Sequence, residues 1–170
     1  MANTNLTPER LKELLHYDED TGIFTRIKQV GSRGLVGDIA GSLNHGYLQI
    51  MVDGEIYLSH RLAWLYVNGV WPKDQIDHID GTRSNNRILN LREATMSENL
   101  QNLRKALSSN KTGLLGASWH KCRSKFQAQI VINRKKHHLG YFDNAQTAHH
   151  AYLKAKQKLH PFAPSILEAK

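Results

Sequence analysis

Hydrophobic positions in the N-terminal part of the chain follow a helical spacing first and a strand-like spacing afterwards. Thr7 can accept the hydrogen bond of an N-cap, Pro8 suits a first helical turn, and leucines then recur on one side until about Tyr17. From Gly22 to Leu58, short β-type runs alternate with glycines, which predicts a small antiparallel sheet. Its strands are expected at residues 23–27, 38–41, 47–52 and 56–58.

A second helix and a compact strand–strand–helix segment are expected next. Ser59 can cap a helix that runs through Val67 with one apolar side, and Asn68-Gly69 can end it. Residues 75–103 then predict a ββα unit. Its parts are a strand at 76–79, a turn at Asp80-Gly81, a polar loop, a second strand near 89–92 and a helix from about Thr95.

The second half of the chain predicts a separate sheet-and-helix domain. Residues 104–115 are polar and rich in turn formers, which is typical of a linker. Asp143-Asn144 can cap a final helix that continues to about Leu159, and its alanines would let it lie close to a sheet. The preceding strands are expected at 116–120, 126–132 and 137–142, with an inner face of Phe126, Ala128, Ile130 and Ile132.

These elements together predict an α+β protein. The N-terminal ββα domain would include a small antiparallel sheet, and the C-terminal domain would be a three-stranded antiparallel sheet packed on one helix. The expected domains are residues 1–103 and 116–160, joined by a linker at 104–115 and followed by a tail at 161–170.

Basic residues are concentrated in the second half of the chain. The formal net charge is +8 at pH 7. Residues 1–98 contain ten Lys/Arg against thirteen Asp/Glu, whereas residues 99–142 contain nine Lys/Arg and no acid. Such a stretch within ordinary folding sequence suits a surface that neutralises phosphates, so we favour a nucleic-acid partner over a merely solvated basic face.

Other classes of protein are disfavoured by what the sequence lacks. Cys122 is the single cysteine, so neither an internal disulfide nor a thiolate zinc site can form. No apolar run approaches the roughly 20 residues needed to cross a bilayer, and the first residues do not form a signal peptide. We therefore expect an intracellular protein with no membrane partner, whose fold depends on core packing.

Oxygen and imidazole side chains between residues 77 and 99 suit phosphodiester hydrolysis. Asp77 can offer an oxygen to a hard divalent ion, and His78 can accept the proton of an attacking water. Neighbours on a regular strand point to opposite sides, so the turn at Asp80-Gly81 would have to bend the backbone. Asn90 can hold the histidine tautomer through its amide oxygen, and Asn99 can give the metal a second oxygen.

Two neighbouring motifs allow more than one interpretation. Asp80 could join the metal site, but an Asp before Gly usually accepts hydrogen bonds within its own turn, so we favour the turn role. His60 and Arg61 open a predicted helix, where they could contact DNA or pack against the ββα unit. The sequence does not separate these two roles.

The residues of this segment resemble those of the HNH homing endonucleases of phages and introns, which are ββα-metal nucleases. The similar motifs are Asp77-His78-Ile79-Asp80-Gly81, Asn85-Asn86-Arg87, Asn90-Leu91-Arg92 and Glu98-Asn99, with further matches at 59–64, 6–9 and 20–22. The resemblance implies Asp77 and Asn99 as metal ligands, His78 as general base, Asn90 as the residue that orients it and Arg92 as a phosphate contact. Many relatives have a histidine at the Asn99 position, and an amide favours Mg²⁺ or Mn²⁺ over zinc.

The second half of the chain resembles the plant ethylene-response-factor DNA-binding domain, which phage HNH enzymes also carry. The similar residues are Gly116, Trp119, Phe126 to Ile130, Leu139 to Phe142 and Ala148 to Tyr152. In that family the sheet lies in the major groove, which implies DNA contacts by Arg123, Lys125, Gln129, Lys136 and His138. The plant pattern has arginines and a tryptophan where this chain has Ser118, Arg123 and His138, so its target sequence cannot be transferred.

The combined interpretation is a metal-dependent HNH endonuclease that acts on double-stranded DNA. We expect a monomer with one Mg²⁺ or Mn²⁺ ion and no obligate protein partner, and the resemblance implies a phage protein inside the host cell. The alternative is a DNA-binding regulator that retains an inactive nuclease scaffold. An RNA-binding module is less favoured, because the second sheet lacks the exposed aromatic pair of RNA-stacking platforms.

Overall fold

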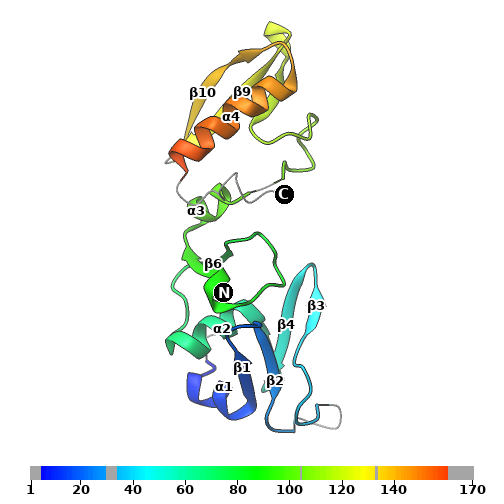
Figure 1. The fold of residues 1–170 in the computed structure, drawn as a ribbon, viewed down its shortest axis with the longest axis vertical. Helices are drawn as coiled ribbons and strands as arrows, with labels where there is room; N and C mark the ends of the chain where they lie inside the picture. Colours follow the sequence, from blue (N-terminus) through cyan, green and yellow to red (C-terminus); the bar gives the residue numbers. More distant parts are fainter. Residues whose placement is uncertain (1–4, 30–33, 104, 133, 161–170) are drawn as a thin grey trace. The chain divides into compact units, whose positions relative to one another are not determined.

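The structure, a computed structural model, describes residues 5–29, 34–103, 105–132 and 134–160. It divides the chain into two compact units, Met1–Ala94 and Thr95–Lys170, each of which is described by itself (Figure 1). This division lies before the expected linker at 104–115, and the expected tail at 161–170 lies outside the described residues. In the described ranges, no helix combines the length and the apolarity needed to cross a bilayer.

The first unit begins with a short helix and a hairpin. Helix α1 (Pro8–Leu14) has the predicted cap, since Thr7 Oγ1 accepts a hydrogen bond from a first-turn amide at 3.2 Å. The helix ends before the predicted limit at Tyr17, because the chain continues as strand β1 (Leu15–Asp18), which pairs antiparallel with β2 (Ile23–Arg26). Buried and exposed residues alternate along β1, as expected for a strand with one buried face.

A three-stranded antiparallel sheet follows in the order β3-β4-β5. Strand β4 (Tyr47–Val52) has the predicted bounds, and β5 (Glu55–Leu58) begins close to its predicted start. The strand expected at 38–41 is not formed in the described structure; this segment makes only an isolated bridge from Ile39 to β2. The third strand is instead β3 (Ser42–Asn44), whose three residues are all exposed and therefore show no hydrophobic alternation.

Helix α2 (Ser59–Asn68) packs against this sheet. Its predicted C-terminus is confirmed, since Gly69 adopts the left-handed conformation that ends many helices. The predicted capping role of Ser59 is wrong: the N-cap position is Leu58, and Ser59 is buried in the first turn. The most deeply buried apolar side chains of the unit come from α1, α2 and the strands and are Leu11, Leu15, Phe24, Ile50, Leu62 and Leu65.

The last sheet of the first unit has two strands separated by a long loop. Strand β6 (Gln75–His78) pairs antiparallel with β7 (Leu91–Ala94), and a single 3₁₀ turn, η1 (Ile88–Asn90), precedes β7. Helix α3 (Met96–Gln101) comes next along the chain and opens the second unit. A capping box between Thr95 and the Glu98 side chain fixes its N-terminus.

The second unit contains the predicted three-stranded sheet, in the order β10-β9-β8. The strands are β8 (Ala117–His120), β9 (Lys125–Ile132) and β10 (Lys135–Phe142), with a 3₁₀ turn, η2 (Lys121–Arg123), after β8. Helix α4 (Ala145–Leu159) lies along this sheet (Figure 1). Both units combine helices with small antiparallel sheets, in agreement with the predicted α+β class.

Small side chains let α4 lie close to the sheet. Ala117, Ala128 and Ala148 are buried together, and the ring of Tyr152 covers the glycine that precedes β8. A Cβ atom at this Gly116 would lie 2.0 Å from Cγ of Tyr152, so no larger residue fits without moving the helix. Near the end of the helix, Lys156 is buried whereas Leu159 is 45% exposed.

We predict that Gly116→Ala loosens α4 far more than Gly113→Ala. Both glycines have a positive φ, where an L-residue is strained. Each substitution should therefore lower the free energy of unfolding by roughly 1–2 kcal/mol. Only Gly116 has a steric conflict, since nothing lies within 4 Å of a Cβ at Gly113. Overpacking should add about 1–3 kcal/mol at Gly116. Hydrogen exchange of residues 145–159 measures the difference, and equal exchange in both variants would contradict it.

Candidate active site

The two residues predicted to begin the site, Asp77 and His78, lie at the end of β6 and are both buried. Their exposed fractions are 5% and 6%. On the neighbouring strand they face Arg92 and Leu91 respectively. Buried polar groups are costly unless each finds a hydrogen-bonding partner, and the two side chains have different partners in the structure.

The carboxylate of Asp77 forms an ion pair across the sheet. Arg92 donates from Nε at 2.9 Å and from Nη2 at 2.7 Å, both to Oδ2 of Asp77. The register of β6 with β7 sets the two residues opposite each other, so the pairing follows directly from the strands. Arg92, predicted to contact phosphate, is here the counter-charge of the predicted metal ligand.

The imidazole of His78 is held by an amide that the sequence did not single out. Nε2 of His78 lies 3.1 Å from Oδ1 of Asn86, whose side chain is almost completely buried. Since an amide oxygen can only accept, Nε2 carries the hydrogen, and the acceptor nitrogen of the neutral ring is Nδ1. This contact is made by Asn86, whereas the sequence predicts Asn90 as the residue that orients His78.

Asn90 instead closes the loop between the two strands. Its Oδ1 accepts from the Asp80 amide at 3.0 Å, and its Nδ2 donates to Oδ1 of Asp80 and to the backbone carbonyl of Asn85. Asp80 also accepts from the Thr82 amide and from the Asn85 side chain, both at 2.7 Å. These bonds give Asp80 the turn role that its position before glycine predicts.

The N-terminal hairpin supports the same loop from the opposite side. The hydroxyl of Tyr17 on β1 donates to the backbone carbonyl of Asn86 at 2.6 Å. Gly22, at the hairpin turn, lies directly against the loop, because a Cβ atom there would be 2.4 Å from the amide nitrogen of Arg87. The residue that holds His78 is therefore fixed by a segment far from it in sequence.

A second histidine packs against the imidazole of His78. The ring of His60, on the first turn of α2, lies edge-on at 5.0 Å between centroids, and Tyr47 lies 5.5 Å from His60 and 6.2 Å from His78. His60 is 5% exposed, and among the described residues its Nδ1 has no hydrogen-bond partner. The packing role of His60, one of two open interpretations, is thus the one that its burial favours.

The neighbouring Arg61 anchors the segment that leads into β6. Its guanidinium donates to the backbone carbonyls of Asp74 at 3.2 Å and Pro72 at 3.4 Å, and it lies over the ring of Trp71. Trp71 in turn donates to the carbonyl of Leu6 at 3.1 Å. These contacts give Arg61 a structural role in the start of the strand.

Burial lowers the pKa of both histidines. The pKa of His60 falls to about 3, first through burial and then through the charges of His78 and Arg61. Burial also lowers the pKa of His78, although its hydrogen bond with Asn86 and the nearby carboxylates act in the opposite direction. The positive charge of Arg83 adds to the lowering. His78 is therefore neutral at pH 7, the form in which an imidazole can accept a proton.

The donor set suits a hard divalent ion with water in its shell. Asp77 provides a buried carboxylate that already neutralises a cation, Arg92. Asn99, the predicted second ligand, lies on α3 in the second unit. In the described part of the chain, no three His, Cys, Asp or Glu side chains form a cluster that could hold a metal alone. A carboxylate oxygen and an amide oxygen are each the kind of donor that Mg²⁺ accepts and that zinc disfavours.

Four of the five predicted DNA contacts of the second unit lie on strands of its sheet, and the fifth, Arg123, lies on η2. Gln129 pairs with His138, and Val131 pairs with Lys136, on the face opposite the alanine core. Tyr141 is not among the predicted DNA contacts but lies beside two of them. Its ring centroid is 4.3 Å from that of His138 and 4.6 Å from the guanidinium carbon of Arg123. Lys125 is engaged in an ion pair with Asp143 at 2.8 Å.

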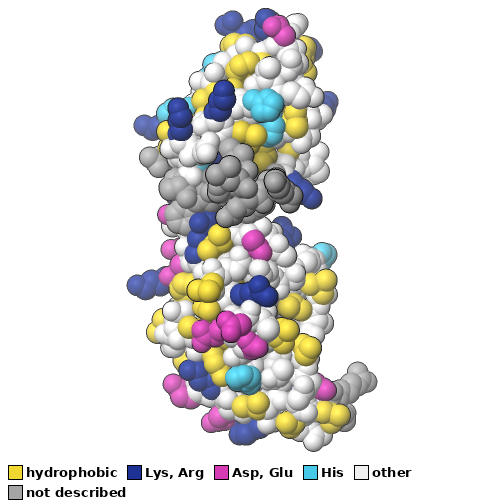
Figure 2. Space-filling model, viewed as in Figure 1, with side chains coloured by type: hydrophobic (Ala, Val, Ile, Leu, Met, Phe, Trp, Pro, Cys, Tyr) yellow, Lys and Arg dark blue, Asp and Glu magenta, His cyan; other side chains and the backbone are white. Residues whose placement is uncertain are grey.

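Charge is distributed over the two units as the sequence predicts. On the face of the molecule drawn in Figure 2, the acidic side chains lie mainly on the first unit. The described residues of the second unit have few acids, and the three contacts of Tyr141 with His120, Arg123 and His138 are all to basic side chains. A phosphate backbone would thus meet less repulsion on the second unit.

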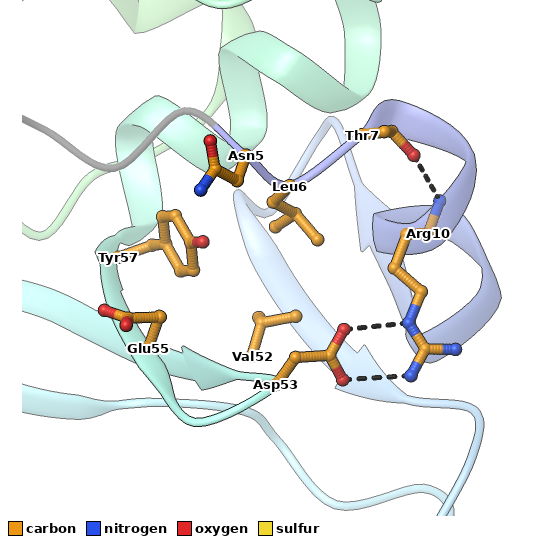
Figure 3. Close-up of a pocket in the computed structure, with 8 residues that line it drawn as sticks. All are labelled: Asn5, Leu6, Thr7, Arg10, Val52, Asp53, Glu55 and Tyr57. Carbon is orange, nitrogen blue, oxygen red and sulfur yellow. Dashed lines mark hydrogen bonds and ion pairs between the residues drawn. The ribbon is translucent and has the colours of Figure 1, made fainter.

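A pocket of about 380 Å³ lies elsewhere on the first unit, between α1 and the β4–β5 turn (Figure 3). Two of its charged groups are paired with each other, since Arg10 donates from Nε and Nη2 to the two carboxylate oxygens of Asp53 at 2.8 and 2.9 Å. The lining residues are Asn5, Leu6, Thr7, Arg10, Val52, Asp53, Glu55 and Tyr57. None of the predicted site residues lines this pocket.

Comparisons with known proteins identify a family over the segment that contains these residues. Residues 57–101 match the family model described as HNH endonuclease. The chain is 35% identical over 102 residues to Protein 3.8 of Escherichia phage T7, and the alignment covers 59% of this chain and 83% of that protein. No solved structure matches significantly. The matched segment contains Asp77, His78, Asn86, Asn90 and Asn99.

We predict that His60 makes the first unit less stable in mild acid. Because its folded pKa is about 3 and the ordinary value is 6.5, only the unfolded state takes up the proton between these values. Lowering the pH from about 7.5 to 5.5 should therefore cost about 1.3 kcal/mol through this residue, a loss that His60→Leu avoids. Urea unfolding at the two pH values measures it.

The control for this experiment is a pH interval in which the histidine does not titrate in either state. Between about pH 7.5 and 8.5, wild type and His60→Leu should change in stability by the same amount. An equal loss of stability in both proteins between pH 7.5 and 5.5 would contradict the prediction.

Proposed function

The chain belongs to the family of Protein 3.8 of Escherichia phage T7 and contains an HNH endonuclease domain, and on this premise we propose that it is a metal-dependent DNA endonuclease. One observation carries the proposal most directly. His78 is buried and neutral, its Nε2 is held by Asn86, and it directly follows the buried carboxylate of Asp77. This is the arrangement that a general base beside a metal ligand requires.

His78 acts as the base on the attacking water. Its Nδ1 takes a proton as the water oxygen forms a bond to phosphorus, and the bond from phosphorus to the 3′ oxygen breaks. The hydrogen bond from Nε2 to Asn86 keeps the ring in the tautomer whose Nδ1 can accept. Asn90 contributes indirectly, because it closes the loop that presents Asn86.

Asp77 and Asn99 are the residues that would hold the divalent ion, Mg²⁺ or Mn²⁺. When bound, the ion neutralises charge on the phosphate and on the departing 3′ oxygen. Arg92 orients the Asp77 carboxylate through its two bonds to Oδ2. Arg92 is also the residue that would contact the phosphate at this site.

The second unit binds duplex DNA through the exposed face of its sheet, as an ethylene-response-factor-type domain does. Its contacts are Arg123, Lys125, Gln129, Lys136 and His138. The support is their shared side of the sheet, opposite the core, and the scarcity of acids around them. Gln129 and Arg123 have the side chains that read adenine and guanine edges in the major groove.

We expect wild type to nick supercoiled DNA with Mg²⁺ and not with EDTA, and His78→Ala to lose the activity by about 10²–10⁴-fold. The loss follows because no other group accepts the proton of the water. His16→Ala is the matched control, since this exposed histidine on β1 lies outside the site. Intact DNA with wild type and Mg²⁺, together with retained duplex binding, would favour the regulator with an inactive scaffold.

A separate measurement tests the sheet of the second unit. In EDTA, Arg123→Ala and Lys136→Ala should each weaken binding to a labelled duplex several-fold and reduce the salt slope of log K by about 1. Lys154→Ala, on the exposed side of α4, removes the same charge from the other layer and should leave the slope unchanged. Fluorescence anisotropy at several salt concentrations gives the slopes. Equal effects from all three variants would contradict the assignment of the face.

A further inference from the structure

Arg83 lies exposed on the loop that follows β6, close to the proposed base. Its guanidinium carbon lies 4.9 Å from the centroid of the Tyr47 ring, and its Nη1 donates to the backbone carbonyl of His45 at 3.4 Å, a long bond. In the described ranges no acidic side chain forms a salt bridge with it. Most of its donors are thus not committed to the protein.

Two other arginines of this region have different surroundings. Arg92 donates twice to Asp77, and Arg61 donates to two backbone carbonyls. Their charges serve the fold or the site itself. Arg83 is instead seated on an aromatic ring, a contact that fixes the plane of the guanidinium and leaves its N–H edge for an anion.

The ring beneath Arg83 belongs to the site. The Tyr47 ring lies 5.5 Å from the ring of His60 and 6.2 Å from that of His78. The strand that carries Tyr47, β4, packs against α2, and His60 lies on the first turn of that helix. The turn before Tyr47 supplies the carbonyl that Arg83 contacts, with His45 and Gly46 both at positive φ. The β3–β4 hairpin therefore holds Arg83 against Tyr47, and Tyr47 in turn lies beside His78, the proposed base.

We propose that Arg83 is a further DNA-contacting residue of the nuclease domain, which binds a backbone phosphate of the strand that is cut, with Tyr47 as its platform. The proposal rests on the nuclease function proposed above. A planar guanidinium matches two phosphate oxygens, and stacking on the ring reduces the entropy lost when it binds. Such a contact is needed here, because residues 1–98 have more acids than bases and would otherwise repel the strand.

The test compares three variants of the full chain in nicking assays over a range of salt concentrations. Arg83→Gln should lower kcat/KM about tenfold or more and reduce the slope of log kcat/KM against log salt by about 1, the value for one lost phosphate contact. Arg83→Lys should keep the slope and recover part of the rate, since it keeps the charge without the planar fork. Lys28→Ala removes a charge whose neighbour is Glu13 on α1 and should match wild type.

The outcomes separate this inference from the nuclease function. If wild type nicks, His78→Ala does not, and Arg83→Gln keeps the wild-type rate and slope, the phosphate contact is overturned and the nuclease stands. If Arg83→Gln loses rate with an unchanged slope, the residue acts through the fold and the phosphate contact is again overturned. If wild type does not nick at all, the nuclease proposal fails and this one fails with it.

Discussion

Two buried polar side chains at the end of one strand set the requirement that the first unit has to meet. Asp77 and His78 are both withdrawn from water, and a buried charge or imidazole is costly unless its bonds are satisfied. The paired strand supplies Arg92 for the carboxylate, and the loop supplies Asn86 for the imidazole. A sheet and a loop that met only one of these needs would leave the other side chain buried without a partner.

Amide and hydroxyl side chains hold the loop that contains Asn86 in place. Asn90 and Asn85 bond to Asp80 and to the loop backbone, and Tyr17 ties the carbonyl of Asn86 to the N-terminal hairpin. These amide and hydroxyl groups direct hydrogen bonds without adding charges of their own to those of Asp80 and Arg83. The pKa of His78 is lowered mainly by burial, and its few charged neighbours have smaller effects.

Regular periodicity explains which elements could be predicted. Strand β4, helix α2 and helix α4 have long, strongly patterned sequences, and the structure contains each of them. Strands β1 and β3 were missed for separate reasons: β1 continues a leucine pattern that also fits a helix, and β3 is exposed at every residue and has no pattern to detect. Both exist because a neighbouring strand pairs with them, a long-range contact that local spacing does not record.

The sequence by itself determined the chemical types in the site, because a carboxylate next to a histidine, with amides at set intervals, is legible without coordinates. It also determined the charge contrast between the halves of the chain and the face of β9 that turns inward. Only the tertiary structure decided which amide contacts the imidazole of His78. Asn86 and Asn90 are equally plausible by type, and the choice depends on how Tyr17 and Gly22 shape the loop. Partners in a loop are fixed by the surface it packs against, which lies far away in sequence.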